Sequence, residues 1–149
     1  MALSKKQCDL LGGIVAAAAF LLADAVFVAR LAGSHNAEQF AGILFLGLSV
    51  PVTYLLISAF RGDRPGIYFI WLGLFLLFLV VEAVLDYLLQ IPFREVRWQV
   101  ILYVMLFFGS LGGLIGVAGL AGRGWTVAAI LGFLSTASLA PAQHLVTGL

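Results

Sequence analysis

Residues 68–90 read YFIWLGLFLLFLVVEAVLDYLLQ, and this stretch decides the fold. An α-helix rises about 1.5 Å per residue, so a helix that crosses the apolar core of a bilayer needs about 20 consecutive apolar residues. The stretch meets that requirement, but it also carries two acids, Glu82 and Asp86. Its length predicts a transmembrane helix, and its acids indicate a functional role.

The composition of the whole chain is that of a membrane protein. Of its 149 residues 63% are hydrophobic and 10% are charged, so little hydrophilic sequence remains for a soluble catalytic or nucleic-acid-binding domain. The net charge is only +1 and the basic residues are scattered, which argues against a nucleic-acid partner. A single cysteine excludes an internal disulfide and any CxxC motif. We therefore expect a chain whose main partner is the lipid bilayer.

The chain divides into five apolar runs, joined by the short linkers GSHNAE, RGDRPG, IPFREVR and GRG. Backbone polar groups in lipid must be satisfied within the segment, so each run is expected to be a helix, and short linkers make successive helices antiparallel. The predicted fold is an all-α integral membrane protein, with residues 1–149 forming a single transmembrane helical domain. Its helices are expected at about 10–32, 39–60, 67–90, 98–121 and 125–147.

The first run allows a second interpretation. Lys5 and Lys6 precede an apolar segment that reaches Ala23-Asp24-Ala25, which has the small-x-small form of a signal peptidase site. Cleavage there would leave four helices. The apolar sequence continues through residues 25–33, however, which favours a retained first helix.

Basic residues predict the orientation of the bundle. The N-terminus and the linkers RGDRPG and GRG together hold five Lys and Arg residues, against three on the other side. Because positive charge favours the cytoplasmic side, the N-terminus is predicted to be cytoplasmic, in a plasma (inner) membrane.

Three acids fall inside the apolar runs: Asp24, Glu82 and Asp86. A charge at the bilayer centre costs about 3 kcal/mol, so such residues usually face a cavity or a partner. Asp24 lies about 21 Å and Glu82 about 22 Å from the start of its helix, which gives them the same depth. Glu82 and Asp86 are four residues apart and share a helix face, so one should keep its proton unless a cation or an arginine lies between them.

Most of the remaining polar side chains fall in the same, outer half of the bundle. We therefore expect an acidic pocket that opens to the outside between the helices at 10–32, 67–90 and 125–147. Asp24, Glu82 and Asp86 are its candidate ligands, supported by Arg30, Tyr87, Gln90, Ser138 and His144. The alternative is an ion-pair network of Asp24, Asp86 and Arg30, with Arg97 as a further candidate, that fixes helix register. In that case Glu82 would be protonated and hydrogen-bonded to a serine.

The fourth predicted helix is rich in glycine. Gly109, Gly112, Gly113 and Gly116 form two GxxxG motifs, which let helices approach closely in lipid. They can pack within the bundle, in a homo-oligomer or against a larger membrane partner. The small residues around Gly12 in the first predicted helix would give a matching flat surface, which favours packing within the bundle.

No catalytic motif, metal-ligand spacing or cofactor motif is recognisable, which favours a non-enzymatic role without metal or cofactor. The favoured function is binding or transport of a cation or weakly basic solute, with Glu82 exchanging it for a proton. A structural or accessory subunit of a larger membrane complex is the alternative. An intramembrane hydrolase that holds a metal between its acids and His144 is the least favoured, because the ligand set is incomplete.

Overall fold

The computed structural model describes residues 2–148, and its regular secondary structure is helical throughout. The elements are α1 (Lys5–Leu31), α2 (His35–Gly47), α3 (Ser49–Arg61), α4 (Gly66–Glu82), a π-helical segment (Ala83–Leu88), a short 3₁₀ turn (Phe93–Glu95), α5 (Arg97–Ala121) and α6 (Arg123–Thr147).

These elements form five helices that are long and apolar enough to cross a membrane, and the predicted number of helices is confirmed. The bounds of all five differ from those expected by one to five residues, and the largest difference is in the first helix, which begins at Lys5 rather than 10. The second begins at His35 rather than 39, and the third ends at Leu88 rather than 90. Both changes move polar residues, because they place Glu38 inside a helix and Gln90 outside one.

The second of these helices is interrupted at Leu48, between α2 and α3. Pro51 has no N–H to donate to the carbonyl of Gly47, so the regular pattern breaks one turn before the proline. The N–H of Leu48 donates instead to the carbonyl of Phe45 at 3.1 Å, a tighter turn than that of an α-helix.

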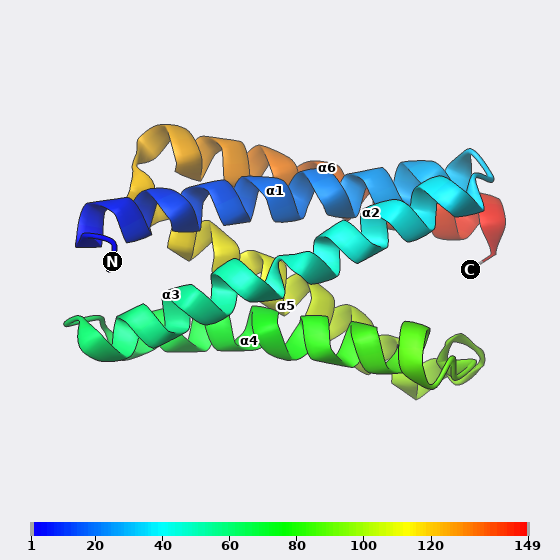
Figure 1. Cartoon of the computed structure of the whole chain (residues 1–149). Helices are drawn as coiled ribbons and strands as arrows, with labels where there is room; N and C mark the ends of the chain where they lie inside the picture. The colour runs from blue at the N-terminus through cyan, green and yellow to red at the C-terminus, as the bar shows by residue number, and fades with distance from the viewer. Residues whose placement is uncertain (1, 149) are drawn as a thin grey trace.

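Figure 1 shows the five helices running back and forth along one long axis, with the two termini at opposite ends. α1 is the central element, because it packs against α2, α5 and α6. α5 crosses behind the bundle and contacts α4 as well as α1 and α6. Removing α1 after Ala25 would therefore remove a helix that three others share.

The helices approach one another closely at the end where the chain begins. A Cβ added to Gly12 would lie 2.8 Å from a methyl carbon of Val117, and one added to Gly13 would lie 2.8 Å from the Cβ of Ala121. A side chain at either position would collide with α5, so glycine lets the backbone of α1 pack directly against the side chains of α5 here.

A buried ion pair lies at this same end of the bundle, which we call the closed end. Arg64, in the loop between α3 and α4, lies 2.6 Å from the carboxylate of Asp9 on α1, and its guanidinium group lies over the ring of Tyr68. Asp9 was not among the acids that the sequence singled out.

At the opposite end the helices diverge. α2 follows α1 upward in Figure 1, whereas α4 and α5 stay in the lower layer. The two layers remain joined by Phe27 of α1 and Phe107 of α5, whose rings meet edge to face at a centroid distance of 6.0 Å. The functional candidates lie in this open end.

Candidate functional site

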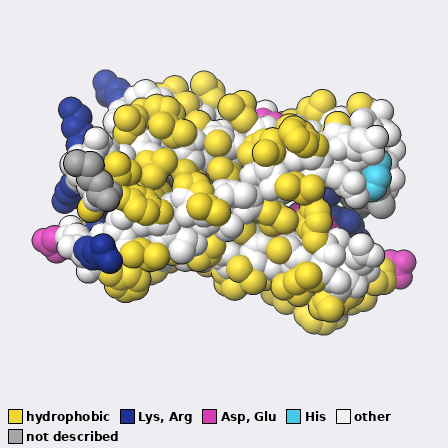
Figure 2. Space-filling model, in the orientation of Figure 1, with side chains coloured by type: hydrophobic (Ala, Val, Ile, Leu, Met, Phe, Trp, Pro, Cys, Tyr) yellow, Lys and Arg dark blue, Asp and Glu magenta, His cyan; other side chains and the backbone are white. Residues whose placement is uncertain are grey.

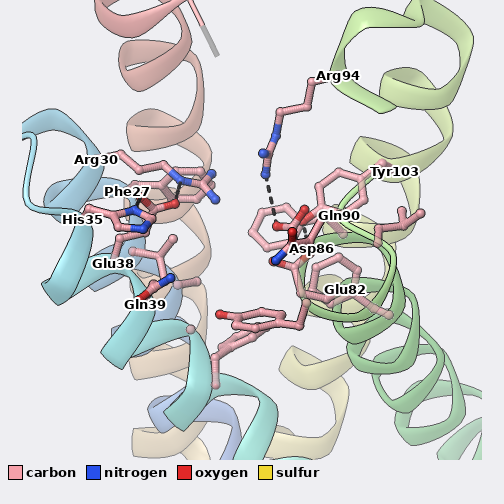
Figure 3. A pocket seen from close by; sticks show the side chains of 18 of the residues that line it. Phe27, Arg30, His35, Glu38, Gln39, Glu82, Asp86, Gln90, Arg94 and Tyr103 are labelled. Carbon is pink, nitrogen blue, oxygen red and sulfur yellow. Dashed lines mark hydrogen bonds and ion pairs between the residues drawn. The ribbon is translucent and has the colours of Figure 1, made fainter. Parts of the chain in front are cut away.

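The open end contains a cavity of about 460 Å³ between α1 and α2 on one side and α4, the π-helical segment and α5 on the other. A volume of this size is typical of small-molecule sites. Figure 2 shows the molecule hollowed at this end between the two layers, with a basic side chain visible in the hollow. Figure 3 shows polar side chains facing each other from the two walls.

The first wall carries Arg30 of α1 and Glu38 of α2. The guanidinium Nε of Arg30 lies 2.6 Å from a carboxylate oxygen of Glu38, and His35 lies 3.9 Å from the other oxygen. The alternative interpretation, in which Arg30 pairs with Asp86 and Asp24, does not agree with the structure, because Arg30 pairs with Glu38 and Asp86 with Arg94. Glu38 is the partner of Arg30 because α2 begins at His35, which places Glu38 in the first turn of α2, beside α1.

The second wall is built by the π-helical segment. α4 ends at Glu82, and the chain then continues with wider turns in which the N–H of Leu89 donates to the carbonyl of Val84. π-Helical turns inside helices occur frequently at functional sites. Asp86 in this segment lies 3.2 Å from the guanidinium group of Arg94, which comes from the loop that follows.

Gln90 ends this wall in an unusual conformation. Its φ angle is 48°, in the left-handed region, where non-glycine residues are uncommon. The expectation of a helix that extends to residue 90 is therefore wrong: Glu82 is the last α-helical residue, Asp86 is π-helical and Gln90 lies outside the helix. All three nevertheless line the cavity.

Glu82 is the third carboxylate that lines the cavity. Its carboxylate accepts a hydrogen bond from the phenol hydroxyl of Tyr103 on α5. Among residues 2–148 it has no ion-pair partner, whereas Glu38 and Asp86 each have an arginine. The cavity thus holds two neutralised carboxylates and one that is held by a hydroxyl alone.

Tyr87 spans the space between the two walls. Its hydroxyl lies so close to Gly42 of α2 that a Cβ at that position would overlap it. The π-helical segment therefore reaches α2 directly through this side chain, and glycine at position 42 makes the contact possible.

The charges lining the cavity do not balance. Three carboxylates, Glu38, Glu82 and Asp86, face two guanidinium groups, Arg30 and Arg94, so one negative charge is left over when His35 is neutral. The excess belongs to Glu82, because the other two acids are paired. A monovalent cation or a proton at Glu82 would neutralise the cavity.

Asp24 does not lie in this cavity. It faces α6, where its carboxylate oxygens accept hydrogen bonds from the hydroxyls of Ser135, at 2.7 Å, and Thr136, at 2.6 Å. The expectation that Asp24 and Glu82 face each other across one pocket is wrong. α1 presents Arg30 and Phe27 to the cavity and Asp24 to α6.

The remaining predicted residues divide in the same way. Arg30, Tyr87 and Gln90 line the cavity with Glu82 and Asp86. Ser138 instead donates to the carbonyl of Leu134 in its own helix, and His144 lines a different cavity. α6 was expected to form one wall of the pocket, but α2 and α5 take its place.

Sequence reasoning missed several polar residues that line the cavity, namely His35, Glu38, Gln39, Arg94 and Tyr103. A signal for Glu38 was present, since a serine followed by an acid within one turn is typical of a helix start. No sequence signal pairs Arg94 with Asp86, because that contact depends on the π-helical turn.

The predicted glycine contacts are found for half of the four residues. Gly113 and Gly116 pack against Trp71 of α4, and a Cβ at Gly116 would lie 2.5 Å from the indole ring. Gly109 and Gly112 have no neighbouring heavy atom within 4 Å of such a Cβ. This helix therefore packs within the bundle on one side and leaves a smooth strip on another.

Within residues 2–148, no three His, Cys, Asp or Glu side chains gather closely enough to hold a metal ion. Comparison of the chain with protein-family models, with curated protein sequences and with solved structures gives no match.

Proposed function

We propose that the chain is an integral membrane protein that binds a small cation or a weakly basic solute at Glu82 and releases it in exchange for a proton. The membrane assignment is supported by large apolar side chains exposed on the helices, for example Phe60 at 78% and Leu145 at 84%. Exposed apolar surface of this extent is unfavourable in water and suits contact with lipid.

The observation that carries the binding proposal is the isolation of Glu82. It lines a cavity of ligand size, and its one partner there is the hydroxyl of Tyr103. A carboxylate in an apolar helix is costly when it is ionised without a counter-charge. It therefore holds either a proton or a cation, which is the requirement for exchange between the two.

The orientation proposed for the bundle places the cavity on the outer side. Lys5, Lys6, Arg61, Arg64 and Arg123 all belong to the closed end, and Figure 2 shows basic side chains gathered there. We assign this end to the cytoplasmic side of a plasma (inner) membrane. The cavity with Glu82 then opens toward the outside.

The test is titration of the purified protein with methylammonium, and with Na⁺ and K⁺, by calorimetry in dodecyl maltoside. We expect saturable binding of at least one of these cations that weakens as the pH falls, because protons compete for Glu82. Glu82→Gln should abolish it, and Asp63→Asn, an exposed acid at the closed end, should not. Binding that is unchanged in Glu82→Gln would refute the proposal.

An accessory subunit remains the second candidate, and one observation favours it. Gly109 and Gly112 leave an uncovered smooth strip on α5, the kind of surface on which another membrane helix packs. Such a subunit would bind none of these cations and would copurify with a larger membrane protein.

A further inference from the structure

A second cavity lies behind the first, between α1, α5 and α6. It has a volume of about 630 Å³. Most of the side chains around it are aromatic or aliphatic: Phe27, Phe93, Val100, Val104, Phe107, Phe108, Ala137, Ala140 and Pro141. We call it the apolar cavity, and the one that contains Glu82 the acidic cavity. Val104 and Pro141 are exposed on the side of the bundle, so the apolar cavity is reached between α5 and α6.

The two cavities are separated by a single layer of side chains. Five residues line both of them: Phe27, Arg30, Arg94, Tyr103 and Phe107. Tyr103 is the central member of this layer. Its ring packs against Phe93 at a centroid distance of 5.0 Å and against Phe78 at 5.5 Å, and its hydroxyl donates to Glu82. The free carboxylate therefore lies one side chain away from an apolar space.

The charges of this layer are already compensated. Arg30 is paired with Glu38, and Arg94 is paired with Asp86 and lies over the ring of Phe93. Neither guanidinium group is held by Glu82. A ligand that spans the layer thus meets the carboxylate of Glu82, which has no ion-pair partner among the described residues, on one side. On the other side it meets mostly apolar side chains, although Glu95, Gln143 and His144 also line the apolar cavity.

We propose that the ligand is a lipophilic amine whose ammonium group binds Glu82 and whose hydrocarbon part occupies the apolar cavity. This inference rests on the proposed function and names its ligand class. The ammonium group replaces the Tyr103 hydroxyl as the partner of Glu82, and rotation of that ring joins the two cavities. Both parts of the ligand then find matching surroundings, since the charge is paired and the hydrocarbon leaves water.

The test compares octylammonium with methylammonium in dodecyl maltoside micelles, with protein-free micelles as the blank. Burial of each methylene should tighten binding on the order of threefold, so octylammonium should bind at least about 100-fold more tightly than methylammonium. Ala140→Trp fills the apolar cavity and should reduce this ratio toward one. Leu145→Trp, on the same helix but 84% exposed, should leave the ratio as it is.

Two results would overturn the inference: a wild-type ratio near one after subtraction of the blank, or a ratio unaffected by Ala140→Trp. If that variant does not fold, Val104→Trp fills the cavity from the opposite wall and must give the same loss. The proposed function fails separately, when neither amine nor metal cation binds in a Glu82-dependent way. Adding phosphatidylethanolamine distinguishes two sources of the amine. If this lipid competes with octylammonium, the occupant is a lipid amine; if it does not compete, the occupant is a free amine.

Discussion

Glu82 and Asp24 are both carboxylates in the middle of apolar helices, yet their neighbours differ. Glu82 faces a cavity and is held by one hydroxyl, whereas Asp24 is held by two hydroxyls of α6. The sequence predicts a similar depth for both, from the helix rise alone. It could not tell which face each one occupies, because helices that are apolar on every side have no polar face to mark the direction of lipid.

Asp24 is therefore expected to stabilise the packing of α1 on α6 and to take no part in binding. Asp24→Ala and Thr136→Val should each lower the free energy of unfolding, with a coupling of about 0.5–1.5 kcal/mol between them. A double-mutant cycle of unfolding in detergent measures this coupling.

Cation binding, titrated in the same variants, is the control for this cycle. It should persist in Asp24→Ala. Loss of binding there, in a protein that remains folded, would place Asp24 in the site after all.

At the scale of the element, α5 offers a matched pair of glycines. Gly116→Ala should destabilise the protein by about 1–3 kcal/mol, because the new methyl group meets the ring of Trp71 at 2.5 Å. Gly112→Ala, one turn away, should be neutral or slightly stabilising, because no atom lies near it. Thermal unfolding of both variants is the measurement. Equal losses of stability in the two variants would show that the contact with Trp71 is not the cause of the destabilisation.

The number and approximate positions of the helices were predictable from the sequence, but the change of helix type within one of them was not. Five apolar runs of sufficient length predicted five helices, since the bilayer fixes the length of a spanning helix. The change from α-helix to π-helix at Ala83 leaves no trace in hydrophobicity, because the segment is apolar in either conformation. Yet this change places Asp86 beside Arg94 and Tyr87 beside Gly42.

For the whole molecule, the proposed orientation is open to a direct test. In a Cys8→Ser background, Ser34→Cys lies in the loop at the open end, and Asp63→Cys lies in the loop at the closed end. A membrane-impermeant maleimide should label the first in intact cells and the second only after permeabilisation. The opposite pattern would place the cavity on the cytoplasmic side.

The closed end has a consequence for passage across a membrane. Below the acidic cavity the bundle is filled by side chains with no exposed surface, among them Val52, Leu72, Phe75 and Leu114. In this arrangement a solute at Glu82 cannot pass through the bundle to the closed end. Translocation would need a second state in which Trp71 of α4 separates from Gly113 and Gly116 of α5. A covalent crosslink between α4 and α5 at this end would therefore block transport and spare binding.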